Sequence, residues 1–298
     1  MTEINTWIKA FRLRTFPLAF SSILMAAFLA YYSGHFQVLI LVLSLFTTLF
    51  LQVLSNLAND YGDALSGVDG PDRGGPQRSV QCGAITREEM KIAIILCTCF
   101  AFISGCILIV CVFKDQWLHL LLFLNLGLGA IAAAIKYTMG SNPYGYSGFG
   151  DIFVFIFFGL VGVFGGYYLF NRELEIIFLL PAISCGLLSV GVLNVNNIRD
   201  ISSDRKAGKR SIPVMIGKEK AIIYHGFLIG GSFISAIFFV SILMPSFFGY
   251  TFLALIPVFF YHFKAVQTKE NSSLDAELKR LAFATLIFVL LLGFGINY

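Results

Sequence analysis

The stretch FQVLILVLSLFTTLFLQVLSNLANDYGD (residues 36–63) decides the fold, because it joins a long apolar segment to a cluster of acidic residues. Its first part carries no charge over more than the roughly 18 residues that mark a transmembrane helix. It then runs directly into Asn59, Asp60 and Asp63. We therefore expect a helix that crosses a lipid bilayer and carries carboxylates where it leaves the apolar region.

The rest of the chain has the same apolar character. Of its 298 residues, 57% are hydrophobic and 13% are charged, against roughly 25% charged residues in an average soluble domain. Too few polar residues remain to cover a water-soluble surface. The sequence predicts an all-α, polytopic membrane protein that forms a single domain over residues 1–298. Its nine expected spans lie near residues 17–33, 36–58, 92–113, 117–135, 152–170, 176–195, 221–243, 246–263 and 281–297.

The positions of the positive charges predict the orientation of these spans. With the N-terminus inside, all of the 21 Lys and Arg residues except Lys114 and Arg172 fall in inner segments. Inner loops of membrane proteins carry such an excess of positive charge. We therefore expect the N-terminus and both acidic loops in the cytoplasm, the C-terminus outside, and a bacterial cytoplasmic membrane as the location. The net charge of +4 then reflects topology, so a nucleic-acid partner is not required.

The acidic pattern occurs twice. The first loop reads NLANDYGDALSGVDGPDRGGPQRSV (56–80), and the second reads NVNNIRDISSDRKAGKRSIPV (194–214). Asp60 and Asp63 are three residues apart and Asp200 and Asp204 are four apart, so each pair shares one face of a helix. The two loops follow the second and the sixth span, which we interpret as a weak internal repeat.

These residue types favour a hard divalent cation. Carboxylate, amide and water oxygens suit Mg²⁺, which prefers one or two carboxylates and completes its shell with water and substrate phosphate. The six cysteines and four histidines show no metal-ligand spacing, and no phosphate-binding Walker loop is present. A diphosphate bridged to the aspartates by Mg²⁺ is therefore the expected ligand. Nearby basic residues would neutralise its remaining charge, namely Arg78, Arg199, Lys209 and Arg210.

Two further segments have alternative interpretations. Lys136 and Tyr137 open the inner segment KYTMGSNPYGYSGFGD (136–151), which reads either as an interfacial turn or as part of the substrate site. Near the N-terminus, Arg12 and Arg14 are either positive-inside anchors or contacts for phosphate or an acceptor carboxylate.

At the acidic loops the sequence resembles the UbiA superfamily of intramembrane aromatic prenyltransferases. The resemblance implies nine helices in a bundle around a central cavity, with Asp-rich motifs after the second and sixth helices. It also implies that Mg²⁺ is bound by Asn59, Asp60, Asp63, Asp200 and Asp204, the four aspartates being catalytic. The residues implied in substrate binding are Asn59, Asn196, Asn197, Arg14, Asp69, Arg78, Lys136, Tyr137, Arg199 and Lys209.

The segments NLANDYGD, GPDRGGPQR (70–78), PYGYSGFGD (143–151) and DRKAGKRS (204–211) resemble the branch that prenylates 1,4-dihydroxy-2-naphthoate. The common family motif NDxxDxxxD has Gly67 at its last position here, with Asp69 two residues later. The resemblance implies that polyprenyl diphosphate and 1,4-dihydroxy-2-naphthoate react to give demethylmenaquinone, diphosphate and CO2.

Two rival functions remain open at this stage. Another UbiA-type enzyme would use a different aromatic acceptor, such as 4-hydroxybenzoate. A secondary transporter would use its acids as cation sites, which predicts charged residues near the bilayer midplane and broken spans. Neither prenyl chain length nor protein partners can be inferred from the sequence.

Overall fold

The computed structural model describes residues 3–67, 78–243 and 247–298, and these ranges contain helices and no strand. Nine helical segments within them are long and apolar enough to cross a membrane, which confirms the predicted all-α polytopic fold. In chain order they are Ile4–Tyr32, Val38–Ser66, Arg87–Phe113, Trp117–Lys136, Gly150–Asn171, Ile176–Arg199, Lys218–Leu243, Phe247–Thr268 and Asn271–Gly295.

Several spans consist of consecutive helical pieces. The main helices are α1 (Ile4–Phe11), α2 (Phe16–Tyr32), α3 (Val38–Ser66), α4 (Arg87–Phe113), α5 (Trp117–Lys136), α6 (Gly150–Val154), α7 (Gly166–Asn171), α8 (Leu179–Arg199), α9 (Ile201–Lys206), α10 (Ile212–Ile216), α11 (Lys218–Leu243), α12 (Ile256–Thr268) and α13 (Asp275–Gly295). Between α6 and α7, η3 (Phe155–Gly165) is a π-helix. The 3₁₀ pieces are η1 (Leu13–Thr15), η2 (Tyr144–Tyr146), η4 (Ile176–Phe178), η5 (Phe247–Leu255) and η6 (Asn271–Leu274).

Most helices extend several residues beyond the spans expected from hydrophobicity. Helix α4 starts at Arg87 rather than near residue 92, because Thr86 and Glu89 form a reciprocal capping box that starts the helix among polar residues. The first span is preceded by α1, which ends at Arg12 in a left-handed backbone conformation (φ 52°). Polar ends continue the helices past the apolar segment, so composition alone places their ends too far inward.

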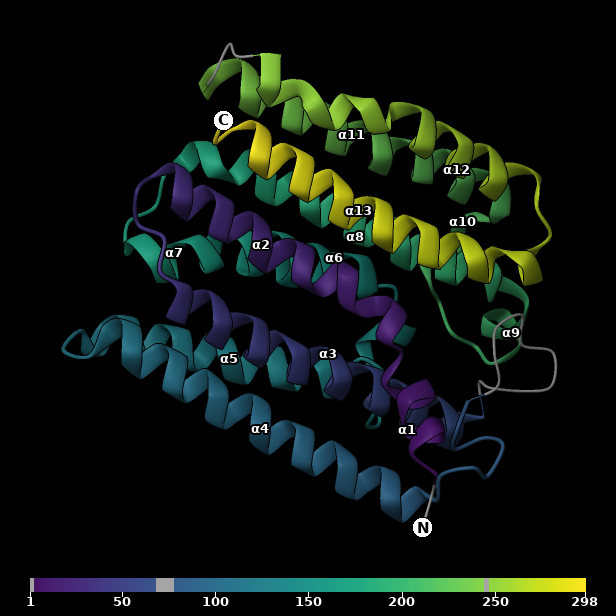
Figure 1. Ribbon diagram of the computed structural model, residues 1–298. Helices are drawn as coiled ribbons and strands as arrows, with labels where there is room; N and C mark the ends of the chain where they lie inside the picture. The colour runs from purple at the N-terminus through teal and green to yellow at the C-terminus, as the bar shows by residue number, and fades with distance from the viewer. Residues whose placement is uncertain (1–2, 68–77, 244–246) are drawn as a thin grey trace.

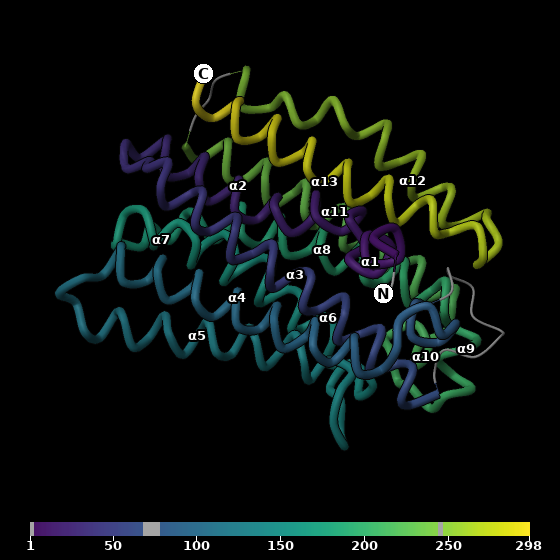
Figure 2. Tube along the Cα trace, turned by 60° about the horizontal axis from the view of Figure 1, so that its bottom comes forward, coloured from purple at the N-terminus to yellow at the C-terminus, as the bar shows by residue number. Residues whose placement is uncertain are grey.

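The spans form one bundle in which distant parts of the chain lie together. Helix α13 packs on α2 and α8, so the last span lies against the first and the sixth. On the other side of α2, helix α3 packs on α4 and α5. Figure 1 shows the two termini at opposite ends of the bundle, as expected for an odd number of spans, and Figure 2 gives the same arrangement from a second side.

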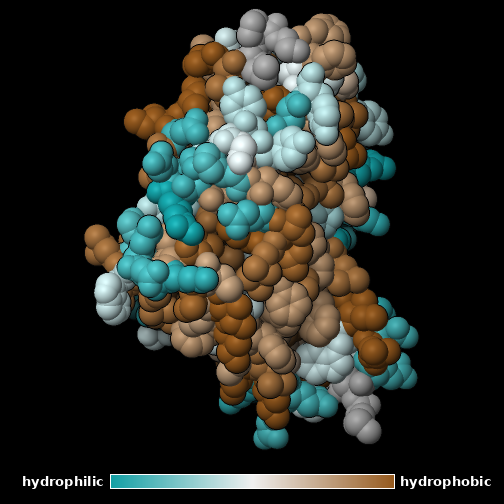
Figure 3. All heavy atoms as spheres, turned by 60° about the vertical axis from the view of Figure 1, so that its left-hand side comes forward, coloured by the Kyte–Doolittle hydropathy of each residue, from teal (hydrophilic) through white to brown (hydrophobic). Residues whose placement is uncertain are grey.

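The outer surface of the bundle is apolar. Side chains such as Ile95, Phe100, Leu121, Phe227 and Phe238 are exposed on the described surface. Figure 3 shows hydrophobic residues over much of one face, with polar residues gathered in patches. Such a surface needs lipid around it, and the chain is an integral, multi-pass membrane protein.

The fifth span is locally widened. Its π-helix η3 lies close to two neighbours at glycines, because a Cβ atom at Gly159 would come 2.7 Å from the carbonyl oxygen of Ala182. At Gly162 a Cβ atom would come 2.8 Å from Cβ of Ser22 on α2. Irregular helical turns of this kind are common at functional sites, and η3 forms one wall of the cavity described below.

Two histidines that look scattered in the sequence meet inside the bundle. Nε2 of His225 on α11 lies 3.0 Å from Nε2 of His262 on α12. Nδ1 of His262 lies 3.2 Å from Oε2 of the fully buried Glu277. Lys269 and Arg280 donate to the other oxygen of Glu277, at 2.7 and 2.6 Å. This polar chain ties α11 and α12 to α13.

Candidate active site

The first acidic segment is the last part of α3. Helix α3 continues through Asn59, Asp60 and Asp63 and ends at Gly67, whose left-handed conformation (φ 70°) terminates it. Asp60 and Asp63 therefore lie on one side of the same helix, as their spacing predicts, and both are buried. Asn59 accepts a hydrogen bond from the hydroxyl of Thr138, at 3.3 Å.

The chain that returns after this segment covers both carboxylates. Arg78 Nη2 pairs with Asp63 Oδ2 at 2.9 Å, and the backbone N–H of Ser79 donates to Asp60 Oδ2 at 3.1 Å. Arg78 thus lies beside the motif, as predicted for it. Asp69 of the same loop lies outside the described residues.

The second acidic segment begins where α8 ends. Arg199 donates two hydrogen bonds to Asp200, from Nε to Oδ1 at 2.9 Å and from Nη2 to Oδ2 at 2.6 Å. The backbone N–H of Asp204, on α9, donates to the carbonyl of Asp200 at 2.8 Å, so a helical turn links the two aspartates. Lys209 Nζ lies 3.3 Å from the Asp204 carboxylate.

Tyr146, on η2, connects the two acidic segments. Its hydroxyl donates to Asp63 Oδ1 at 2.7 Å, and Nζ of Lys209 lies 5.7 Å from the centre of its ring. The backbone N–H of Arg210 donates to its carbonyl at 2.8 Å. One residue of the third inner segment therefore contacts both loops. We call the end of the bundle where they meet the acidic end; the label α9 marks it in Figure 1.

The charges at the acidic end depend on one another. Burial raises the pKa of Asp204 above its ordinary value, and the nearby carboxylates of Asp200 and Asp63 raise it further, while Lys209 opposes the shift. Burial alone would lower the pKa of Lys209, but the surrounding acidic groups, led by Asp204, raise it well above the usual range. Lys209 is therefore a permanent cation, and the carboxylates gain from every further positive charge placed near them.

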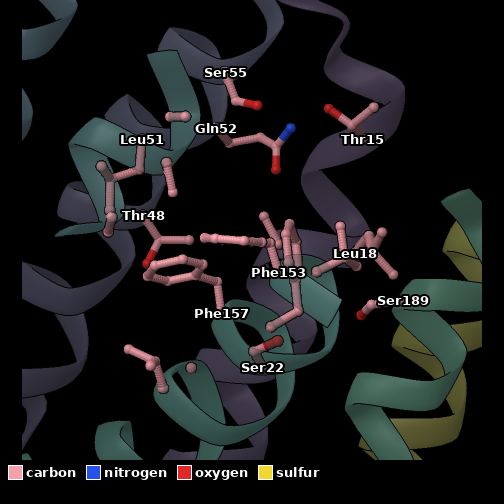
Figure 4. Close-up of a pocket in the computed structure, with 18 of the residues that line it drawn as sticks. Thr15, Leu18, Ser22, Thr48, Leu51, Gln52, Ser55, Phe153, Phe157 and Ser189 are labelled. Carbon is pink, nitrogen blue, oxygen red and sulfur yellow. The ribbon is translucent and has the colours of Figure 1, made fainter. Parts of the chain in front are cut away.

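A cavity of about 420 Å³ opens at this end and continues between the helices. It reaches from Asp63 to Ser44 along α3, about 28 Å at the helical rise per residue, close to the ~30 Å hydrocarbon thickness of a bilayer. Figure 4 shows Thr15, Gln52 and Ser55 on one side, with Phe153 and Phe157 projecting into the space. Seven predicted site residues line it: Arg14, Asn59, Asp63, Arg78, Tyr137, Asn196 and Lys209.

Five of the other predicted residues lie behind this lining. Asp60, Asp200 and Asp204 are buried next to it, as are Asn197 and Arg199. Lys136 is exposed at the end of α5. The cavity wall at that point is aromatic instead, because Tyr137 packs edge-on against Tyr144 (5.4 Å between ring centres) and Tyr144 stacks on Phe153 at 4.0 Å.

Comparisons with known proteins identify the family of this chain. The UbiA prenyltransferase family matches residues 19–295. The chain belongs to this family. It is 41% identical to a 1,4-dihydroxy-2-naphthoate octaprenyltransferase of Escherichia coli (strain K12), over 97% of this chain and 96% of that protein.

Solved structures share the UbiA fold. The apo structure of a UbiA homolog from Aeropyrum pernix K1 superposes with a TM-score of 0.70 at 18% identity, covering 96% of this chain and 97% of the other. A UbiA homolog from Archaeoglobus fulgidus bound to GPP and Mg²⁺ superposes with a TM-score of 0.65 at 16% identity, covering 98% and 99%.

The donor atoms at the acidic end of this UbiA chain fit Mg²⁺ chemically. The buried side chains that the described residues contribute there carry carboxylate and amide oxygens, as in Asp60, Asp63, Asn197, Asp200 and Asp204. Within the described residues no three His, Cys, Asp or Glu side chains form a ready metal cage. Mg²⁺ takes few protein carboxylates and completes its shell with water and phosphate. Asn59, Asp60 and Asp63 with Asp200 and Asp204 are the residues that would hold it.

Two site residues were missed from the sequence. Tyr146 stands in the segment 143–151, whose tyrosines and glycines also fit an ordinary interfacial turn. Asp275 accepts hydrogen bonds from Arg14 and from Arg199, and it lies between the expected spans 246–263 and 281–297, where no site residue was predicted. A local signal for Tyr146 existed in its position between the Tyr144-Gly145 and Ser147-Gly148 pairs, whereas none existed for Asp275.

Proposed function

We propose that this chain transfers a polyprenyl group from polyprenyl diphosphate to 1,4-dihydroxy-2-naphthoate, releasing diphosphate and CO2 and giving demethylmenaquinone in its reduced, hydroquinone form. The observation that carries the proposal is the 41% identity, along nearly the whole chain, to a protein named for this acceptor. The cavity supports it, because a charged end continues into an apolar space about as long as a membrane is thick. A polyprenyl diphosphate is likewise charged at one end and apolar along its isoprenoid tail.

The diphosphate would bind among the cations that line the acidic end. Arg14, Arg78 and Lys209 face the cavity there, and Lys209 stays charged because of its raised pKa. Fixed positive charge near the bond that breaks stabilises the negative charge that grows on the leaving oxygen. Asn196 and Asn59 add amide groups at the same level of the cavity.

Mg²⁺ is the proposed cofactor, held by Asn59, Asp60, Asp63, Asp200 and Asp204. When bound, the ion screens the charge of the departing diphosphate. The protein's own part is to hold these oxygens in place: Arg78 and Tyr146 fix Asp63, and Arg199 fixes Asp200. Asp69 and Asn197 stay proposed contributors to substrate binding.

The aromatic wall would protect the reacting carbon. The donor's C–O bond breaks with its electron pair going to diphosphate, and the naphthalene ring attacks the allylic cation to form a C–C bond. Tyr137, Tyr144 and Phe153 keep water away from this cation, and aromatic faces also attract positive charge. Burial raises the pKa of Tyr137 to about 12, so its phenol stays protonated and does not compete as a nucleophile. The acceptor loses CO2 and no oxidant is consumed, so the product forms as the hydroquinone.

We further propose that the whole chain is one domain, with the acidic end in the cytoplasm of a bacterial cell and the C-terminus outside. The packing of α13 on α2 supports a single domain. The lopsided distribution of Lys and Arg supports the orientation.

Product analysis tests the proposed function directly. The purified chain in lipid nanodiscs is given octaprenyl diphosphate with either 1,4-dihydroxy-2-naphthoate or 4-hydroxybenzoate, with and without Mg²⁺, and products are identified by mass spectrometry. We expect prenylated naphthohydroquinone and CO2 only with the naphthoate and the ion. Prenylated 4-hydroxybenzoate would assign the chain to the rival acceptor, and the absence of any prenylated product would refute prenyl transfer.

The roles of the aspartates are tested in the same assay. Asp60→Ala, Asp63→Ala, Asp200→Ala and Asp204→Ala are each expected to abolish nearly all turnover, because each removes a carboxylate from the acidic end. Asp115→Ala, which removes an exposed carboxylate from the loop between α4 and α5, is the control. Normal magnesium-dependent activity in two of the four variants would defeat the assignment.

A further inference from the structure

The first turn of α13 holds an acid that joins separate parts of the site. Asp275 is the first residue of this helix. One oxygen of its carboxylate accepts from Nη1 of Arg14, which follows α1, and the other accepts from Nη1 of Arg199 at 2.6 Å. The two arginines are far apart in the sequence, and Asp275 is the carboxylate that both of them contact.

Arg199 is fully engaged by the protein. Its side chain is 1% exposed, and it donates from Nε and Nη2 to Asp200 and from Nη2 to Asn196 at 2.9 Å. With Nη1 on Asp275, all three guanidinium nitrogens are used. Because a guanidinium group is planar, the hydrogen bond from Nη1 to Asp275 also fixes the orientation of Nε and Nη2, which donate to Asp200.

The outcome is a line of alternating charges: Asp200, Arg199, Asp275 and Arg14. At one end stands a proposed metal ligand, and at the other stands an arginine that lines the cavity. An acid at a helix N-terminus is favourable by itself, but that preference does not explain why both oxygens are taken by arginines from other elements. The contacts of Asp275 with both arginines therefore indicate a role beyond stabilising the N-terminus of α13.

We propose that Asp275 is a positioning residue of the active site: it sets Arg14 and, through Arg199, Asp200 and Asn196 for binding of the diphosphate and its metal ion. This rests on the proposed function for the identity of the ligand. In this proposal Arg199 orients Asp200 and Asn196 and does not contact phosphate. The first turn of α13, in the ninth span, then influences the reaction.

Binding and kinetics of Asp275→Asn test this role. The full-length chain is titrated in nanodiscs with inorganic pyrophosphate at fixed Mg²⁺, using calorimetry, and kcat and KM are measured with octaprenyl diphosphate. Loss of a residue that orients a ligand typically costs about 10- to 100-fold in affinity or activity. We expect Asp275→Asn to weaken pyrophosphate binding by about that factor and to raise KM for the donor while KM for the naphthoate stays within about twofold.

Three further variants separate positioning from general effects. Asp275→Glu keeps the carboxylate and should recover part of the loss. Asp275→Asn combined with Arg199→Lys should cost less than the sum of the two single changes, since both break the same line of contacts. Glu270→Gln removes the same charge from an exposed residue in the same connection and should leave binding unchanged. Thermal unfolding of each variant in nanodiscs verifies that it is folded.

The outcomes are distinct. Pyrophosphate affinity of Asp275→Asn within twofold of the unchanged protein, or an equal loss in Glu270→Gln, would overturn the positioning role. If the unchanged protein binds magnesium pyrophosphate and Asp275→Asn weakens that binding, but no prenylated naphthoate forms, the proposed function fails and the positioning role stands. If the unchanged protein does not bind magnesium pyrophosphate, both are wrong.

Discussion

The two acidic segments have similar sequences but present different groups to the cavity. In the first segment Asn59 and Asp63, near the end of α3, face the cavity, whereas in the second the residues that face it are Asn196, near the end of α8, and Lys209, which follows α9. Asp200 and Asp204 lie behind, held by Arg199 and Lys209. The first segment therefore presents a carboxylate together with Arg78, whereas the second presents a cation and keeps both of its aspartates out of the lining, so the internal repeat does not make the two halves equivalent.

The two segments are also held in place differently. Helix α3 is held by close packing, because a Cβ atom at Gly62 would come 2.6 Å from Oγ1 and 2.7 Å from the carbonyl oxygen of Thr138. The second segment is held by ion pairs, from Arg199 to Asp275 and from Lys209 to Asp204. The first segment thus has steric support in addition to its Arg78–Asp63 ion pair, and the second relies on ion pairs, so the two should respond to different substitutions.

The largest effect is expected at Asp63, the aspartate that lines the cavity. Asp63→Asn keeps the shape but removes the charge that faces the proposed ion, and should lower kcat/KM by about 1,000-fold, as for loss of a group that stabilises transition-state charge. It should also raise the Mg²⁺ concentration needed for half-maximal rate. Asp200→Asn is the comparison, and an equal shift in magnesium dependence there would make the two segments equivalent after all.

Lys209 should come next, with a different signature. Lys209→Gln removes the cation that the second segment presents, and we expect kcat/KM to fall by about 100-fold, mainly through KM for the diphosphate donor. Lys209→Arg should restore part of the rate, and Lys220→Gln, at an exposed lysine, should change little. If Lys209→Gln altered only the KM for the naphthoate, the cation would serve the acceptor and this half of the comparison would be wrong.

Tyr146→Phe probes the link between the segments. It removes the hydroxyl that donates to Asp63 and keeps the ring beneath Lys209. A hydrogen bond to a charged group is worth about 1.5–3 kcal/mol, so we expect kcat/KM to fall by about tenfold or somewhat more. Tyr144→Phe, whose hydroxyl donates to the carbonyl of Ala133, is the matched control. Equal kcat/KM for the two variants would show that the hydroxyl at position 146 does not position Asp63.

The smallest effect on catalysis, and a measurable one on stability, is expected at Gly62. Gly62→Ala forces the backbone of α3 away from Thr138, and overpacking of this kind typically costs about 1–3 kcal/mol. Thermal unfolding in nanodiscs should occur at lower temperature than for Gly105→Ala, where the new Cβ atom would meet Cγ2 of Thr47 at an ordinary 3.7 Å. Identical unfolding temperatures would argue against steric support of the first segment.

Much of the fold could be predicted because it follows from local patterns. Long apolar runs identify helices whatever their neighbours, and three- and four-residue spacings place Asp60 with Asp63 and Asp200 with Asp204. Those patterns cannot indicate which face of a helix turns toward a cavity formed by seven or more helices. This is why the sequence ranked Asp63 and Asp204 alike, although only Asp63 lines the space.

Contacts between distant residues account for what was missed. Arg14 and Asp275 are 261 positions apart. In the sequence, Asp275 stands near Lys and Arg residues whose positions the predicted membrane orientation already explains. His225 and His262 likewise come together only because α11 packs on α12. Pairings of this kind depend on the order in which whole helices pack, which no short motif records.

The contact between Arg14 and Asp275 has a consequence for biogenesis. A ribosome delivers the N-terminal part of a chain first, so eight spans can enter the membrane before the ninth brings Asp275 to its arginines. A nascent or truncated protein without α13 would carry both acidic motifs but would lack the contacts of Asp275 with Arg14 and Arg199. With the role proposed for Asp275, the acidic end is fully assembled only once α13 has packed against α2 and α8.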